Sequence, residues 1–198
     1  MTPMANWILL RAAGIGAYVA LFLAVVWGVV STTGVVTKRV SKPAANSFHA
    51  FVASVGLALL GVHIALLLID QFMPFQPLDI VVPMRSTFRP LPIAFGVVAM
   101  YVTVAVMVSS WVRKRMSTVW WRRIHLLSVP AFVLVLLHGV FAGTDTQRPW
   151  MIALYGATGV FTLFLVLVRG LTAGYRAPRQ VAAKPSRPDM KREPASAA

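Results

Sequence analysis

Five long apolar runs dominate this sequence of 198 residues, and none of them contains Asp, Glu, Lys or Arg. Each has about 20 residues, the length that a helix with a rise of about 1.5 Å per residue needs to cross a bilayer. Backbone inside a bilayer must satisfy its own hydrogen bonds, and helices do so where open strands cannot. The sequence therefore predicts an all-α fold, an integral membrane helical bundle with five transmembrane helices. The runs are Ala12–Val30, Phe48–Ile69, Leu91–Val112, Ile124–Ala142 and Pro149–Val168.

Composition separates this chain from soluble enzymes and from nucleic-acid-binding proteins. It is 58% hydrophobic and 12% charged, whereas soluble domains have about 25% charged residues. A formal net charge of +14 would suggest nucleic acid in a soluble protein, but here most basic residues flank the apolar runs, as in membrane proteins. The chain has no Cys, which excludes disulfides, iron–sulfur clusters, zinc fingers and thioether-attached haem. We expect the membrane, and no nucleic acid, as its partner.

The distribution of basic residues predicts the orientation. Fifteen of the 19 Lys and Arg residues fall in the first loop, the third loop or the C-terminal tail, which five crossings place on one side. Because cytoplasmic loops carry the excess of basic residues, we expect the N-terminus outside and the C-terminus in the cytoplasm of a multi-pass protein of the plasma membrane. Cleavage of residues 1–30 as a signal peptide is the alternative. It would leave the basic loops outside, and the first run is too long for a signal-peptide core.

The chain divides into a membrane domain and a tail. Residues 1–170 hold all five runs, and their long second loop, Gln71–Pro90, is rich in Pro and is expected to form an irregular outer cap. Residues 171–198 combine Pro and Ala with Lys and Arg and cannot bury a core. We expect them to form a disordered basic cytoplasmic tail near anionic lipid.

All four histidines of the chain lie in two of the apolar runs. His49 and His63 are 14 residues apart in the second run, and His125 and His138 are 13 residues apart in the fourth. Both runs start from the same basic side, so the two helices are parallel. They place one histidine pair near the cytoplasmic face and a second pair about four turns further out.

Paired imidazoles at two depths fit bis-histidine ligation of haem. A macrocycle takes two axial nitrogens from opposite sides, and neutral imidazole is tolerable in an apolar site. We therefore expect two noncovalent b-type haems with their irons about 20 Å apart along the membrane normal. The competing interpretation is that each histidine only hydrogen-bonds a neighbouring helix. A di-metal site would need carboxylate or thiolate ligands and a proton relay would need Asp or Glu, and the runs contain none of these.

The spacing of the second histidine pair does not suit one face of a straight helix. A separation of 14 residues brings His63 back to within about 40° of the helix face that carries His49. A separation of 13 residues leaves His138 about 140° away from the face that carries His125. Pro130 lies between them, and proline removes a helical hydrogen bond. We therefore predict a kink or π-bulge near Pro130 that re-aims His138.

These features resemble the ferric reductase-like transmembrane domain superfamily, which includes ferric reductases, NADPH oxidases and the haem-binding membrane subunit of periplasmic methionine sulfoxide reductase. The resemblance rests on both histidine spacings and on Trp121-Arg122-Arg123-Ile124-His125, followed by an apolar helix that ends Leu136-Leu137-His138-Gly139. It covers about Ala12 to Arg169. It implies that His49 and His125 bind the inner haem and that His63 and His138 bind the outer one.

The resemblance also implies an activity, transmembrane electron transfer by the membrane haem subunit of an oxidoreductase. We expect no flavin- or nicotinamide-binding region on this chain, so flavin would be present only on a partner, with a cytoplasmic flavin reductase or a quinol as the donor. An extracytoplasmic redox protein or a small acceptor would receive the electrons, and a quinone is a further candidate cofactor. Two alternatives stay open: a quinol-oxidising cytochrome b, and a haem-free membrane anchor or assembly subunit.

Arginines near the ends of the runs are candidates to bind haem propionates, which are anionic. We expect Arg122 and Arg123, with Arg115, to serve the inner haem, and Arg85 or Arg89 the outer one. The competing interpretation is that they are ordinary interfacial anchors.

Overall fold

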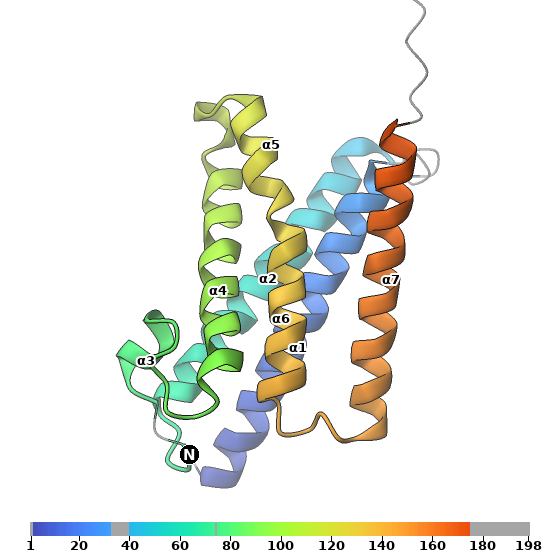
Figure 1. The fold of residues 1–198 in the computed structure, drawn as a ribbon. Helices are drawn as coiled ribbons and strands as arrows, with labels where there is room; N and C mark the ends of the chain where they lie inside the picture. The colour runs from blue at the N-terminus through green and yellow to red at the C-terminus, as the bar shows by residue number, and fades with distance from the viewer. Residues whose placement is uncertain (1, 33–39, 74, 175–198) are drawn as a thin grey trace, which may run out of the picture.

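The computed structural model describes residues 2–32, 40–73 and 75–174, and this part of the chain is helical without strands (Figure 1). Five segments are long and apolar enough to span a membrane, which confirms the predicted all-α bundle. Most of the predicted tail, 171–198, and the basic residues Lys38 and Arg39 lie outside the described residues. The helices are α1 (Pro3–Ser31), α2 (Lys42–Leu68), α3 (Pro77–Val81), α4 (Pro90–Trp111), the 3-10 helix η2 (Arg113–Arg115), α5 (Thr118–Leu126), α6 (Ser128–Ala142) and α7 (Pro149–Gly174).

The long helices cross the bundle in alternating directions, so their connections gather at two ends (Figure 1). We call one end the basic end; it holds the start of α2, η2, α5 and the end of α7. The opposite end holds the N-terminus, the α3 loop and the α6–α7 loop. Helix α2 and the segment α5–α6 both run from the basic end to the opposite end, which is the parallel arrangement that the basic loops predict.

Local sequence explains where the helices start. Proline occupies the first turn of α1, α2, α4 and α7, where its missing N–H leaves no helical bond unmade. The side chains of Thr2, Ser41 and Ser117 cap α1, α2 and α5 by accepting from backbone N–H groups. Helix α1 begins at Pro3, nine residues before the predicted run, so Arg11 lies inside it. There Arg11 forms an ion pair with Asp145 of the α6–α7 loop.

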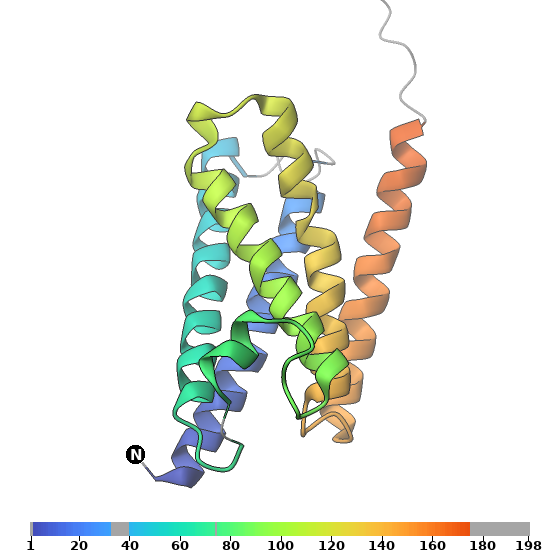
Figure 2. The same ribbon diagram turned by 60° about the vertical axis from the view of Figure 1, so that its left-hand side comes forward.

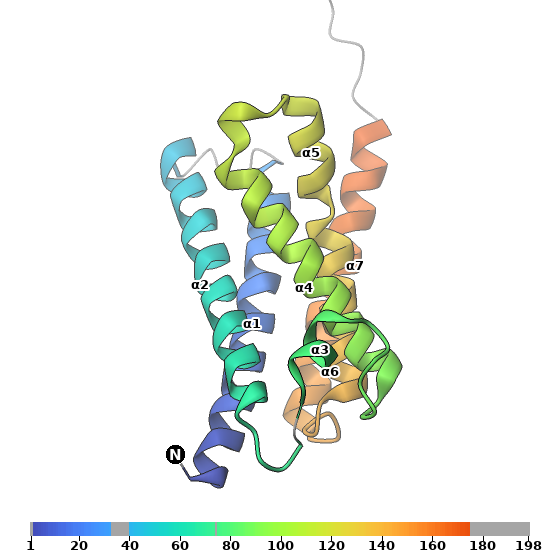
Figure 3. The same cartoon turned by 90° about the vertical axis from the view of Figure 1, so that its left-hand side faces the viewer.

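Two antiparallel helix pairs form the body of the bundle (Figures 2 and 3). Helix α1 packs along α2, and α4 packs along α6; α7 lies against α1 and α6. The core between α1, α6 and α7 is aromatic: Phe132 is 1% exposed and packs against Tyr18 and Phe22, with ring centroids 5.6 and 5.8 Å apart. Phe132 is thus a helix-packing residue.

The fourth span is interrupted beside Pro130, as predicted. Because Pro130 has no N–H, the carbonyl of Leu126 cannot receive its usual helical bond, and α5 ends at Leu126. The N–H of Leu127 instead donates to Ile124 at 3.0 Å, and α6 starts at Ser128. The interruption is a break between two helices and not a π-bulge. It lies between His125 and His138, which therefore are not constrained to the angular spacing of a straight helix.

Candidate functional site

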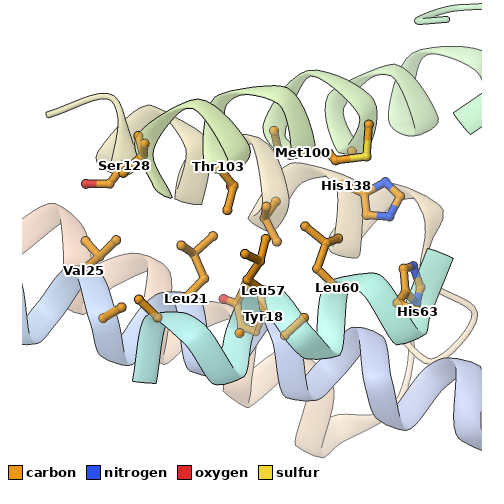
Figure 4. A pocket seen from close by; sticks show the side chains of 18 of the residues that line it. Tyr18, Leu21, Val25, Leu57, Leu60, His63, Met100, Thr103, Ser128 and His138 are labelled. Carbon is orange, nitrogen blue, oxygen red and sulfur yellow. The ribbon is translucent and has the colours of Figure 1, made fainter. Parts of the chain in front are cut away.

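A cavity of about 820 Å³ lies between the two helix pairs, and all four histidines line it. Its walls are otherwise largely apolar, with residues from α1 and α2 on one side and from α4, α5 and α6 on the other (Figure 4). His49 and His125 lie towards the basic end and are called the basic-end pair. His63 and His138 form the opposite-end pair and face each other across the cavity (Figure 4). The structure thus brings together the four residues that the sequence singled out.

The opposite-end pair is held by two backbone carbonyls. His63 Nδ1 lies 3.0 Å from the carbonyl oxygen of Leu10 on α1, and His138 Nδ1 lies 2.9 Å from that of Pro92 on α4. A carbonyl can only accept a hydrogen bond, so Nδ1 must be the protonated nitrogen in both rings. This fixes the tautomer and leaves the lone pair of each Nε2 available to a metal, the usual arrangement of metal-binding histidines.

The basic-end pair has the spacing that a shared metal would require. The ring centroids of His49 and His125 are 5.8 Å apart. Two metal–nitrogen bonds of about 2 Å, with roughly 1 Å from each nitrogen to its ring centre, give a separation of about 6 Å. Trp121 stacks on His125 with centroids 5.0 Å apart, and the guanidinium of Arg113 lies 4.2 Å from the Trp121 ring centre.

Glycines give three of the histidines room against the neighbouring helix. A Cβ added at Gly96 would lie 2.7 Å from His138 Nδ1, and one at Gly14 would lie 3.0 Å from His63 Nδ1. At Gly28 the nearest atom would be His49 Cε1 at 3.4 Å. Sequence analysis did not identify these glycines, because the register between the helices that makes them neighbours of the histidines is visible only in the fold.

The donor set and the cavity fit haem better than a polynuclear metal site. The described residues contain no group of three or more His, Cys, Asp or Glu side chains that could hold a metal ion, so the ligands come in pairs. Three buried polar atoms of lining residues, Ser31 Oγ, His49 Nδ1 and Trp121 Nε1, have no hydrogen-bond partner among the described residues. Unpaired buried donors are costly, and the carboxylates of a bound haem are acceptors for such donors.

The five arginines predicted to bind propionates all lie outside the cavity lining: Arg85, Arg89, Arg115, Arg122 and Arg123. Arg85 pairs with Asp79 at 3.7 Å, and Arg89 donates to the carbonyl of Phe141 at 2.6 Å. Arg123 lies over Trp120 at 5.2 Å from its ring centre, and Arg122 is exposed. The arginines that do line the cavity are Arg11, Arg113 and Arg169. Their positions directly before or after an apolar run were visible in the sequence, but nothing there distinguished them from interfacial anchors.

Comparison with family profiles matches residues 13–137 to the family described as "Ferric reductase like transmembrane component". The matched segment includes His49, His63 and His125 and ends one residue before His138. No curated protein and no solved structure matches the chain. The match spans α1 to α6 and so contains both helix pairs that enclose the cavity. A match over more than half of the chain, on the part that carries the histidine cavity, means that the protein belongs to the ferric reductase-like transmembrane family.

Proposed function

We propose that this protein carries electrons across the plasma membrane through two noncovalent b-type haems. His49 and His125 would hold one haem at the basic end, and His63 and His138 would hold the other at the opposite end. One observation carries the proposal: two opposed histidine pairs line a single apolar cavity between parallel helices. Family membership supports it at a coarser level, as a membrane component of electron transfer.

The residues of the chain supply ligands, orientation and insulation. Each bound haem would supply a one-electron iron couple. The carbonyls of Leu10 and Pro92 keep the Nε2 atoms of His63 and His138 free to bind, and the apolar walls exclude water from the path. Fourteen residues separate His49 from His63 on the continuous helix α2, a rise of about 21 Å that matches most of the membrane thickness.

The direction of transfer follows from the predicted orientation. With the basic end in the cytoplasm, a cytoplasmic flavin reductase or a quinol would donate to the basic-end haem, and an extracytoplasmic redox protein or small molecule would accept from the other. The chain would then act as the membrane haem subunit of an oxidoreductase system. Arg122 and Arg123 at the basic end, and Arg85 and Arg89 at the opposite end, stay candidate propionate ligands, and Arg113 joins them because it lines the cavity.

Haem content and spectrum of the purified protein test the proposal. We expect a low-spin bis-histidine b-type spectrum and about two haems per chain. A protein that folds but stays colourless with haem in excess would overturn it and favour the haem-free anchor. Mixing the loaded protein separately with a membrane quinol and with a cytoplasmic flavoprotein, and following haem reduction, distinguishes the two classes of donor.

A further inference from the structure

The contacts of the histidines repeat between the two helix pairs. On α1, Gly14 lies against His63, and the carbonyl one turn earlier, that of Leu10, accepts a hydrogen bond from His63 Nδ1. On α4, Gly96 lies against His138, and the carbonyl one turn earlier, that of Pro92, accepts a hydrogen bond from His138 Nδ1. Each helix thus presents a small residue to the ring and the preceding carbonyl to its nitrogen.

A second such position follows 14 residues later on each helix. On α1 it is Gly28, which lies against His49; the carbonyl one turn earlier is that of Ala24, but His49 Nδ1 makes no hydrogen bond among the described residues. On α4 it is Ser110, which faces His125. Ser110 is therefore the one member of the four that carries a side chain, and it belongs to the basic-end pair.

The hydroxyl of Ser110 stands between the histidine ring and the backbone. Ser110 Oγ donates to the carbonyl of Val106, one turn earlier, at 2.8 Å, and lies 3.5 Å from His125 Nδ1. The hydroxyl proton is used by Val106, so an oxygen lone pair faces the ring. The hydroxyl thus stands between His125 and a carbonyl of the kind that Leu10 and Pro92 present to His63 and His138.

The presence of serine at position 110 weakens the hydrogen bond that orients His125. A hydroxyl oxygen at 3.5 Å accepts the Nδ1 proton less strongly than a carbonyl at 2.9 or 3.0 Å. A histidine whose Nδ1–H is bonded weakly is a less basic metal ligand, and ligand basicity is one of the levers that set the potential of a haem. Less electron donation favours the reduced iron.

Resting on the proposed function, we infer that Ser110 is a positioning residue that fixes the tautomer of His125 and sets the reduction potential of the basic-end haem above the value that a direct bond to the Val106 carbonyl would give. A hydrogen bond to the Val106 carbonyl does not by itself explain a serine at position 110, because the hydroxyl of Ser109 already donates to that carbonyl at 2.8 Å. Ser109 is buried and has the same backbone partner, but within the described part of the chain it makes no hydrogen bond to a histidine, so it provides a matched control.

Three variants of the full, haem-loaded protein test the inference by potentiometric titration and by the electron paramagnetic resonance of the low-spin haems. Ser110→Gly opens the Val106 carbonyl to His125, so we expect one of the two midpoint potentials to fall. Ser110→Ala removes the acceptor without adding room, so we expect the same potential to rise and the matching resonance signal to shift. Ser109→Ala should leave both potentials in place. Repeating the titration in His63→Ala, which keeps the basic-end pair, identifies the haem that moves.

The outcomes separate this inference from the function on which it rests. Two haems with unchanged potentials in Ser110→Ala would overturn the role of Ser110 and leave the electron-transfer proposal intact. An equal shift in Ser109→Ala would also overturn it, because the effect would then come from helix packing. If the wild-type protein binds no haem, both proposals fail together. Should Ser110→Gly not fold, the Ser110→Ala and Ser109→Ala results decide the matter alone.

Discussion

The two ends of the cavity use the same ligand type but hold it differently. At the opposite end, both imidazoles bond to backbone carbonyls at 3.0 and 2.9 Å. At the basic end, His125 has the 3.5 Å contact with Ser110, and His49 Nδ1 is buried without a hydrogen bond of ordinary geometry. Aromatic stacking with Trp121 orients His125 instead. Backbone carbonyls of a helix cannot move far, so the opposite-end pair should be rigid and the basic-end pair adaptable.

This difference suggests that the two ends of the cavity have different roles. If haem is bound as proposed, a rigid pair would keep the iron environment constant in both oxidation states, whereas a pair held by stacked side chains would be tuned by single substitutions near Ser110, Trp121 and Arg113. The basic end is also where the fourth span breaks, so His125 sits at the end of the short helix α5. Variants at each end test whether the two pairs differ in this way.

Removing one ligand from each pair should have the largest effect. We expect His138→Ala to lose the opposite-end haem and His125→Ala the basic-end haem, so that each variant keeps about one haem of two. The remaining low-spin signal should differ between the variants, since the two pairs have different surroundings. Haem content and resonance spectra measure this. Loss of both haems from either variant, in a protein that still folds, would show that the pairs do not act independently.

Replacing the glycines that contact the histidines by alanine should have the next largest effect, and Gly96 should be the most sensitive of these positions. A Cβ at Gly96 meets His138 Nδ1 at 2.7 Å and its Cε1 at 2.9 Å, so Gly96→Ala must displace the ring from the Pro92 carbonyl. We expect a loss of stability of about 1–3 kcal/mol and weaker haem retention at the opposite end. Gly14→Ala should follow, and Gly28→Ala, with 3.4 Å available, should cost least. Thermal unfolding and haem loss rates give the order.

Gly61→Ala is the control for this series. Gly61 lies on α2 two residues before His63, and an added Cβ there meets nothing within 4 Å. Replacing a glycine inside a helix by alanine should stabilise it by about 0.5–1 kcal/mol. A loss of haem in Gly61→Ala as large as in Gly96→Ala would mean that glycine in the helices matters for flexibility and not for space.

Restoring the missing helical bond should disturb the basic end more than the opposite end. Pro130→Ala supplies an N–H that can bond to Leu126 and favours one continuous helix over the break. Since α6 is anchored by Phe132 in the core, we expect the short helix α5 to turn and His125 to leave its position against His49. The result should be partial loss of the basic-end haem, seen as a reduced haem content with an unchanged opposite-end signal. An unchanged haem content would show that the break is not needed for alignment.

How much of this could be predicted from sequence depends on how rare each residue is in its setting. A histidine in a charge-free apolar run stands out, and the loss of a hydrogen bond at Pro130 is a property of proline itself, so both were predictable. Gly96 and Ser110 were not, because small residues are common in membrane helices and their meaning depends on which ring packs against them. The extent of α1 was also missed, since Arg11 ended the apolar run although its ion pair with Asp145 lets the helix continue.

Replacing arginines at the basic end should have the smallest effect. It tests most directly whether that end is adaptable. Arg113 lines the cavity and lies over the Trp121 ring that stacks on His125, whereas Arg122, predicted from the sequence, is exposed and outside the lining. A nearby positive charge favours the reduced iron, so Arg113→Gln should lower the potential of the basic-end haem modestly. Arg122→Gln should lower it less, because solvent and salt screen an exposed charge. A larger shift for Arg122→Gln in the same titration would mean that Arg122 reaches a propionate when haem is bound, and that the basic end rearranges on loading as an adaptable site would.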